Sequence, residues 1–182
     1  MGDTISVGGG VDQAVTARIR SGWNSFRQLA SFLTAKDISL LERGKVYDAC
    51  IRSCMLYESK TWALNRENEI KLERNEMKMV RWMVGTKLIE RVPSKELRQR
   101  LGLEDMQSVL RKRRLRWLGH VERHEGEWIK KCTELKITGQ VGSGRPKKTW
   151  KEVVEKDMRE VGLRRQDAMD RVKWRSGLMN IG

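Results

Sequence analysis

Apolar residues recur every three or four positions along much of the chain, a spacing that predicts amphipathic helices. Three such stripes follow one another at about residues 12–33, 39–57 and 66–84. We expect Asp12 to cap the first helix, Ser39 to open the second through a capping box with Glu42, and Gly85 to end the third. The short connections between them predict a small helical bundle.

The second half of the chain continues the pattern in shorter pieces. A short helix is expected after Pro93, and a longer one is expected from an N-cap at Asp105 through His124. We expect the longer helix to bury the face that carries Met106, Leu110, Arg113, Trp117 and Val121. Two prolines in 182 residues leave long stretches without a helix breaker, so the sequence predicts an all-α fold.

The C-terminal part is expected to begin with a flexible, basic, Gly-rich linker over residues 138–148. Thr149 and Glu152 form a second capping-box pattern, which predicts a helix that ends at Gly162. Glu152, Glu155 and Asp157 lie on this helix among lysines, and we assign all three to its surface. A last short helix is expected around residues 169–174.

The formal net charge of +14 favours a polyanionic partner, because a field of that size attracts nucleic acid and speeds its association. An anionic membrane surface or an acidic protein is the alternative. No stretch approaches the roughly 18 apolar residues of a membrane span, and no secretory segment follows Met1. Residues 1–6 fit the loose myristoylation pattern, which we treat as a chance match. Three cysteines without an export signal predict reduced thiols and an intracellular location, nuclear or cytoplasmic.

The densest basic segment lies on the predicted helix that ends at His124. Lys112 and Arg116 should flank its apolar face on one side, and Arg111 and Arg114 on the other, so that the helix could dock on a bundle and reach phosphates on both sides. The candidate residues in this segment are Arg111, Lys112, Arg113, Arg114 and Arg116. Such contacts release counterions and carry no base-reading code. The alternative is a solvated face paired with Glu104 and Glu122.

A second basic segment, with Arg145, Lys147 and Lys148, lies in the predicted linker. Its Gly-Arg-Pro core is similar to arms that insert an arginine into a narrow minor groove, but Ser143 stands where such arms carry a basic residue. A plain linker is an equal alternative. The glycine spacing from residue 139 to 144 also imitates a phosphate-binding loop, but Arg145 and Pro146 replace its required Lys and Ser/Thr.

Metal and catalytic chemistry find little support in the sequence. Cys50 and Cys54 lie one helical turn apart, as do His120 and His124, and two such pairs could bind zinc. The cysteines also fit a core stripe, and we therefore expect no metal and no other cofactor. The chain lacks an Asp-Asp pair and a cluster of carboxylates for two-metal phosphoryl transfer, so we expect no catalytic residues.

Several ordered motifs nevertheless resemble one protein family. They are Arg18-Ile19-Arg20-Ser21-Gly22-Trp23-Asn24-Ser25-Phe26, Tyr47-Asp48-Ala49-Cys50, Leu56-Tyr57-Glu58-Ser59-Lys60-Thr61-Trp62, Arg113-Arg114-Leu115-Arg116-Trp117-Leu118-Gly119-His120-Val121, Gly144-Arg145-Pro146-Lys147-Lys148-Thr149-Trp150 and Lys173-Trp174-Arg175. In this order they resemble the C-terminal region of non-LTR, LINE-type retrotransposon reverse transcriptases, some of which also carry an endonuclease. The match covers nearly the whole chain.

The resemblance implies a position behind a polymerase palm. Residues 1–11 would be a flexible palm remnant, 12–85 a thumb-like three-helix bundle, 86–137 post-thumb helices, 138–148 the linker and 149–182 a C-terminal helical segment. The partner would be a template-primer duplex of RNA or DNA, together with a palm domain that is separate or upstream. No position here matches the catalytic residues of the family. We therefore expect a non-catalytic fragment that binds nucleic acid without sequence preference.

A different class of function stays open. The chain could be a helical protein-interaction module, or a translated transposon remnant without a selected function. Seven tryptophans and nine methionines on amphipathic helices would then mark surfaces that once met the missing palm.

Overall fold

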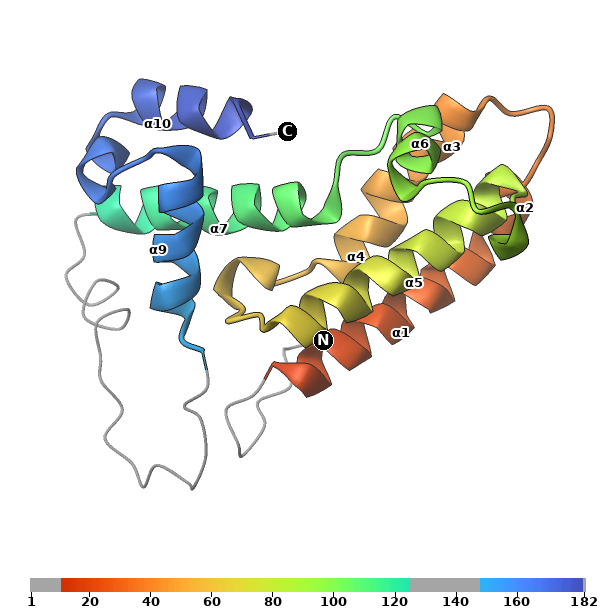
Figure 1. The fold of residues 1–182 in the computed structure, drawn as a ribbon, viewed down its shortest axis with the longest axis horizontal. Coiled ribbons are helices and arrows are strands. Elements are labelled where there is room, and N and C mark those ends of the chain that lie inside the picture. Colours follow the sequence, from red (N-terminus) through yellow and green to blue (C-terminus); the bar gives the residue numbers. More distant parts are fainter. Residues whose placement is uncertain (1–10, 125–147, 182) are drawn as a thin grey trace. The chain divides into compact units, whose positions relative to one another are not determined.

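Figure 1 shows the fold in a computed structural model, which describes residues 11–124 and 148–181. Every regular element in these residues is a helix, so the fold is all-α as predicted. The chain forms two compact units. Of the described residues, 11–58 and 65–109 form unit 1, and 59–64, 110–124 and 148–181 form unit 2.

Unit 1 is built from three long helical segments, which we call rods, and from shorter elements that connect or follow them. Its elements are α1 (Asp12–Gln28), α2 (Ala30–Leu33), α3 (Leu40–Val46), the π-helical segment η1 (Tyr47–Arg52), α4 (Ser53–Met55), α5 (Arg66–Val84), the 3-10 turn η3 (Leu88–Glu90) and α6 (Ser94–Arg100). The first rod is α1, the second is the continuous run α3–η1–α4, and the third is α5. Helix α7 (Met106–Arg123) begins in unit 1 and continues into unit 2.

Among its described residues, unit 2 contains the rest of α7 and four further elements. These are the 3-10 turn η2 (Ser59–Thr61), α9 (Trp150–Val161), the 3-10 segment η4 (Arg165–Met169) and α10 (Arg171–Met179). The division differs from the expected domain ranges in two respects: α6 and the start of α7 belong with the bundle, and residues 59–64 belong with the C-terminal helices. Residues 1–10 of the expected palm remnant, the myristoylation pattern and residues 138–147 of the linker lie outside the described residues.

Local signals place most of the helix ends correctly. Ser39 accepts a hydrogen bond from the Glu42 amide while Glu42 accepts one from the Ser39 amide, which is the predicted capping box. Asp105 accepts from the amide two residues later, and Gly85 adopts the left-handed conformation that ends α5. The prediction for Asp12 is wrong. Asp12 is the first helical residue, Val11 holds the cap position without a side-chain bond, and the Asp12 carboxylate instead faces the helix dipole from the first turn.

The second rod contains a π-helical turn in its middle. The stripe of apolar residues leaves open whether Cys50 or Ile51 faces the core, and the structure buries Ile51 while Cys50 is exposed. The wider π turn places both Ile51 and Arg52 on the buried side of the rod. A guanidinium group therefore enters the core of the bundle.

Arg52 is held there by carboxylates from a neighbouring rod. Its Nη2 lies 2.6 Å from Glu76 Oε1 on α5, and its Nε donates to the same oxygen over 2.9 Å. Arg98 on α6 binds the second oxygen of Glu76 at 3.3 Å and also pairs with Glu73. The backbone carbonyl of Glu104 accepts a further bond from Arg52. The network links the second rod, α5 and α6 through one buried carboxylate.

Burial shapes the protonation equilibria of this network. It raises the pKa of the Glu76 carboxyl above its ordinary value against the opposing charges of Arg52 and Arg98. It also raises the pKa of the neighbouring Tyr47 hydroxyl, which is fully buried in the same core. Burial by itself lowers the pKa of Arg52, but the charge and hydrogen bond of Glu76 raise it above its ordinary value.

Replacing Glu76 by Ala should strongly destabilise unit 1, because Arg52 would stay buried without its main partner. We expect a loss of about 3–5 kcal/mol in the free energy of unfolding, measured by urea titration. The matched control is Glu69→Ala on the same helix, where a surface pair with Arg66 is removed and a loss of about 0–1 kcal/mol is expected. Equal losses for the two variants would contradict the structural role of Glu76.

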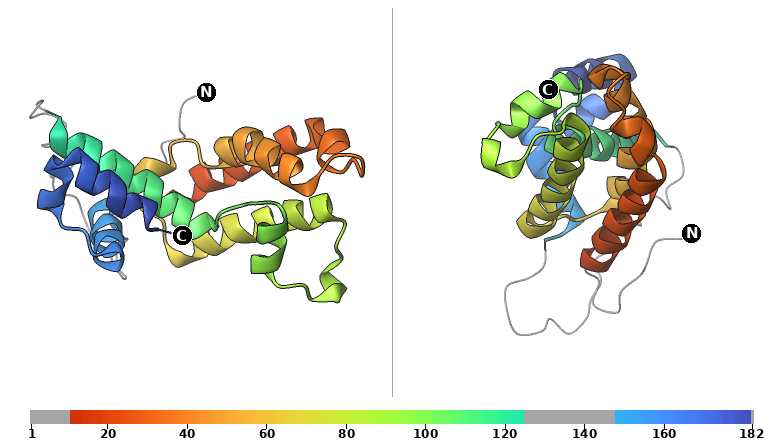
Figure 2. Two further views of the ribbon diagram at one scale, coloured as in Figure 1. Left: turned by 90° about the horizontal axis from the view of Figure 1, so that it is seen from above. Right: turned by 90° about the vertical axis from the view of Figure 1, so that its right-hand side faces the viewer.

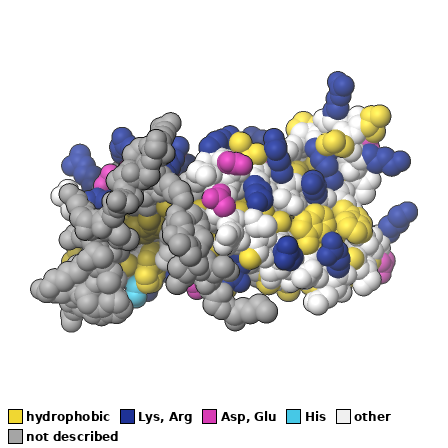
Figure 3. All heavy atoms as spheres, turned by 90° about the horizontal axis from the view of Figure 1, so that it is seen from below, with side chains coloured by type: hydrophobic (Ala, Val, Ile, Leu, Met, Phe, Trp, Pro, Cys, Tyr) yellow, Lys and Arg dark blue, Asp and Glu magenta, His cyan; other side chains and the backbone are white. Residues whose placement is uncertain are grey.

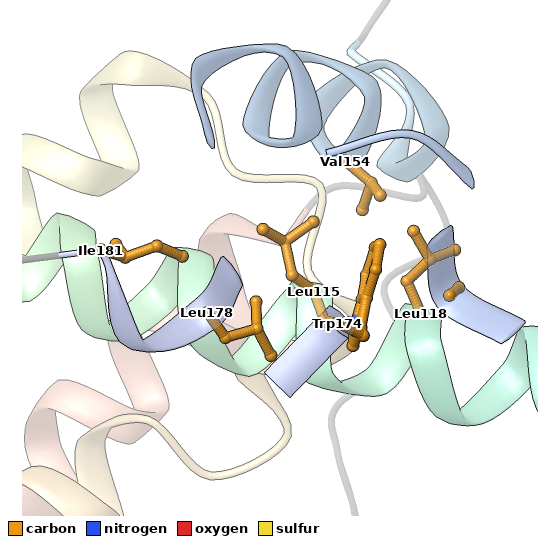
Figure 4. Packing of buried hydrophobic residues seen from close by; sticks show 7 residues of the cluster. Leu115, Leu118, Val154, Trp174, Leu178 and Ile181 are labelled. Atoms are coloured by element: carbon orange, nitrogen blue, oxygen red, sulfur yellow. The ribbon is translucent and has the colours of Figure 1, made fainter. Parts of the chain in front are cut away.

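Unit 2 has its own apolar core, which Figure 4 shows from close by. The ring of Trp174 on α10 stands between Leu115 and Leu118 of α7, and Val154 of α9 closes the cluster from another side. The indole Nε1 of Trp174 donates to the Leu115 carbonyl over 3.0 Å. Gly119 makes room for this ring, because a Cβ atom there would lie 2.3 Å from the indole nitrogen.

Gly119→Ala should therefore destabilise unit 2. The added methyl group forces the Trp174 ring away from α7, and overpacking of this kind costs about 1–3 kcal/mol. The expected result is a lower midpoint in thermal unfolding followed by Trp fluorescence. Ser176→Ala on the exposed side of α10 is the control and should leave the midpoint unchanged. An unchanged midpoint for Gly119→Ala would show that α7 and α10 do not pack in this way.

The helices that the structure describes do not include one with both the length and the apolar character needed to cross a membrane.

Candidate nucleic-acid interface

The arginines of α7 divide between two faces of the helix. Arg114 is only 2% exposed, and its Nε donates to Asp157 Oδ2 on α9 over 2.6 Å. Arg111 lies beside it and pairs with Asp157 and with Glu160. The inner side of α7 is thus bound to α9 through two arginines and two carboxylates.

This arrangement corrects three expectations from the sequence. Arg111 and Arg114 do not line a solvent-facing flank, because both are paired with α9. Asp157 is buried instead of lying on the surface. The partners of Arg111 and Arg114 lie on α9, whereas Glu122, one of the acids considered as a partner from the sequence, pairs with Arg165 at 2.7 Å. A sequence signal for Asp157 did exist: it follows Val153 by four positions and Val154 by three, so it falls on the apolar stripe of its own helix.

The buried face of α7 also differs from the predicted one. Leu110 and Val121 are buried as expected, but Leu115 and Leu118 are buried in place of Arg113 and Trp117. The physical reason is tertiary. Trp174 and Val154 pack against Leu115 and Leu118, and this contact sets the rotation of α7 about its axis.

The rotation directs a different set of cations outward. Arg116 is exposed, and Lys112 and Arg113 are half-buried on the side of α7 away from the core. We call Lys112, Arg113 and Arg116 the outer cations of α7. They lie within little more than one helical turn of one another, so their charges act on the same stretch of surface.

Trp117 and His120 extend this outer face by one turn. The two rings are stacked with their centroids 5.5 Å apart, and the His124 ring follows His120 at 5.9 Å. Lys60, from η2, places its ammonium group 4.6 Å from the centroid of Trp117. The Lys60 carbonyl accepts from Trp150 Nε1 over 2.8 Å, which ties η2 to α9. Sequence reasoning missed Lys60, because its distance from α7 along the chain hides the contact.

The chemistry of this face suits phosphate groups better than bases. Guanidinium and ammonium groups bind phosphate oxygens through charge-assisted hydrogen bonds. The Trp117 ring already has Lys60 on one side and His120 stacked against it, so it offers little free surface to a base. The face can therefore contact a nucleic-acid backbone without reading its sequence.

The remaining candidates from the sequence are only partly described. Lys148 is exposed immediately before α9, whereas Arg145 and Lys147 lie outside the described residues. Within the described residues, no group of three or more His, Cys, Asp or Glu side chains could hold a metal ion. Cys50 is exposed, and the Cys54 sulfur lies 3.7 Å from the Ser25 hydroxyl.

Comparison with known proteins adds no family to this picture: protein-family models, curated protein sequences and solved structures all give no match to the chain.

Asp157→Ala should destabilise unit 2 more than any substitution on the outer face of α7, because it leaves the buried Arg114 without a counter-charge. We expect a loss of about 3–5 kcal/mol in the free energy of unfolding, measured by urea titration. Glu160→Ala removes the more exposed partner of Arg111 and should cost only about 0–1 kcal/mol. A small effect of Asp157→Ala would mean that Arg114 faces solvent and is available to ligands.

Proposed function

We propose that the chain binds RNA or DNA without sequence preference, through phosphate contacts made by the outer cations of α7. The observation that carries the proposal is the division of the α7 arginines. Arg111 and Arg114 are used to hold α9, while Lys112, Arg113 and Arg116 face away from the core.

The distribution of charge supports the proposal. Residues 59–64 and 110–182 hold 21 of the 38 Lys and Arg residues but only 10 of the 24 acidic residues, so they carry +11 of the net charge of +14. The acids that lie nearest the basic segment, Asp157 and Glu160, are already paired with its inner arginines. A polyanion approaching this part of the chain therefore meets a net positive field.

We further propose that the chain is the C-terminal region of a non-LTR retrotransposon reverse transcriptase, with a palm domain upstream or separate. This proposal is supported by the structural roles of the motifs that carry the resemblance. Four of them contribute to unit 2, through Lys60, Gly119, Trp150 and Trp174. Such a chain would hold a template-primer duplex, and a palm domain would supply the polymerase chemistry.

The proposal is tested by replacing Lys112, Arg113 and Arg116 together with Gln. Binding to a mixed-sequence duplex should weaken, and the slope of log affinity against log salt should become shallower by about 2–3, since each phosphate contact contributes about 0.9 to that slope. Fluorescence anisotropy at several salt concentrations measures both quantities.

The control removes the same charge from an exposed part of α9, by replacing Lys151, Lys156 and Arg159 with Gln. It should change the slope much less. Equal changes in the two triple variants would indicate a diffuse electrostatic effect, and an unchanged slope in the α7 variant would remove α7 from the interface.

A further inference from the structure

Unit 1 carries an aromatic cluster on the seam between α1 and α5. These helices run side by side in the same direction, as Figures 1 and 2 show, and paired contacts advance along both. Trp23 and Phe26 of α1 meet Trp82 of α5, with ring centroids 6.5 and 5.3 Å from that of Trp82. Phe26 is fully buried, whereas Trp82 is 52% exposed. A large aromatic ring therefore rests on two others and presents the rest of its surface to solvent.

The cluster is held in place before any ligand arrives. Trp23 Nε1 donates to Asn75 Oδ1 over 3.1 Å, and the Asn75 side-chain amide donates to the Lys71 carbonyl over 2.8 Å. The Trp23 and Phe26 rings meet nearly edge to face, at 69° and 5.6 Å. Because these bonds fix the supporting rings, Trp82 loses little conformational freedom when a planar group stacks on it.

Cations lie one helical turn from these rings. Arg20 and Arg27 precede and follow Trp23 on α1, Lys78 precedes Trp82 on α5, and all three are exposed. The positions one turn apart along this side of α5 are Lys71, Asn75, Lys78 and Trp82, and none is acidic. Figure 3, which views this side of unit 1, shows an apolar patch surrounded by Lys and Arg side chains.

We infer that this seam is a binding site for single-stranded nucleic acid, in which an unpaired base stacks on Trp82 and the flanking cations hold the adjacent phosphates. The alternation of cations with an exposed, supported aromatic ring is what a single strand requires. A duplex offers phosphates but keeps its bases stacked on one another. An apolar protein surface would fit Trp82 but would strip water from Arg20, Arg27 and Lys78 without pairing them.

The test uses the full-length chain and a labelled 12-nucleotide oligo-dT strand. Trp82→Ala should weaken binding by about 5- to 150-fold, the range that loss of one base–aromatic stack produces. Trp82→Phe, which keeps a stacking ring, should recover most of the affinity. Heparin, a polyanion without bases, and a blunt hairpin duplex should bind the Ala variant as they bind the parent chain.

Tyr57→Ala is the matched control. Tyr57 is 50% exposed in the same unit, but the Arg18 guanidinium lies over its ring, 4.4 Å from the centre, and already occupies a face on which a base could stack. Its removal should leave affinity for the single strand unchanged. Thermal unfolding of each variant checks that the fold is retained, and the Phe variant keeps the test valid if the Ala variant melts early.

Two outcomes would overturn the inference. The first is unchanged oligo-dT affinity in Trp82→Ala. The second is an equal loss of affinity for oligo-dT, heparin and duplex, which would make the effect electrostatic or structural. The site is independent of the outer cations of α7. The effect of Trp82→Ala should persist in the Lys112, Arg113 and Arg116 triple variant, so either site can fail without the other.

Discussion

Buried guanidinium groups must find carboxylates, and this constraint shapes both units of the protein. Arg52 enters the core of the bundle and meets Glu76 of α5, while Arg114 lies beneath α9 and meets Asp157. A buried charge without a partner is strongly destabilising, so each pair specifies which helices pack and in which rotation. The chain has 38 Lys and Arg residues, and some of them join two helices through ion pairs.

The same constraint separates the buried, paired cations from those on the outer sides of the helices. On α7 the inner arginines are occupied by α9, and the packing of Trp174 against the helix leaves Lys112, Arg113 and Arg116 on the outside. In the bundle, Glu76 is occupied by Arg52 and Arg98, while a different side of α5 carries Lys78 and Trp82. Each unit therefore combines an inner, neutralised ionic layer with an outer basic one.

In this structure, the motifs that resemble the C-terminal region of a reverse transcriptase supply mainly residues that pack against one another. Gly119 gives space to Trp174, and Trp150 binds the backbone beside Lys60. Residues far apart in the chain thus depend on one another sterically, which accounts for their individual identities without any contact to a ligand. The proposed ligand contacts lie beside these residues, on neighbouring positions of the same helices.

The sequence by itself determined the helices and most of their ends, because capping boxes, glycine stops and 3.6-residue stripes act within one or two turns. It also determined that the protein is basic and all-α. Only the tertiary structure decided the rotation of α7, the burial of Asp157 and the meeting of Trp23, Phe26 and Trp82. Periodicity shows that a helix has an apolar side, but when Leu, Trp and the stems of Arg compete for that side, the neighbouring helix selects among them.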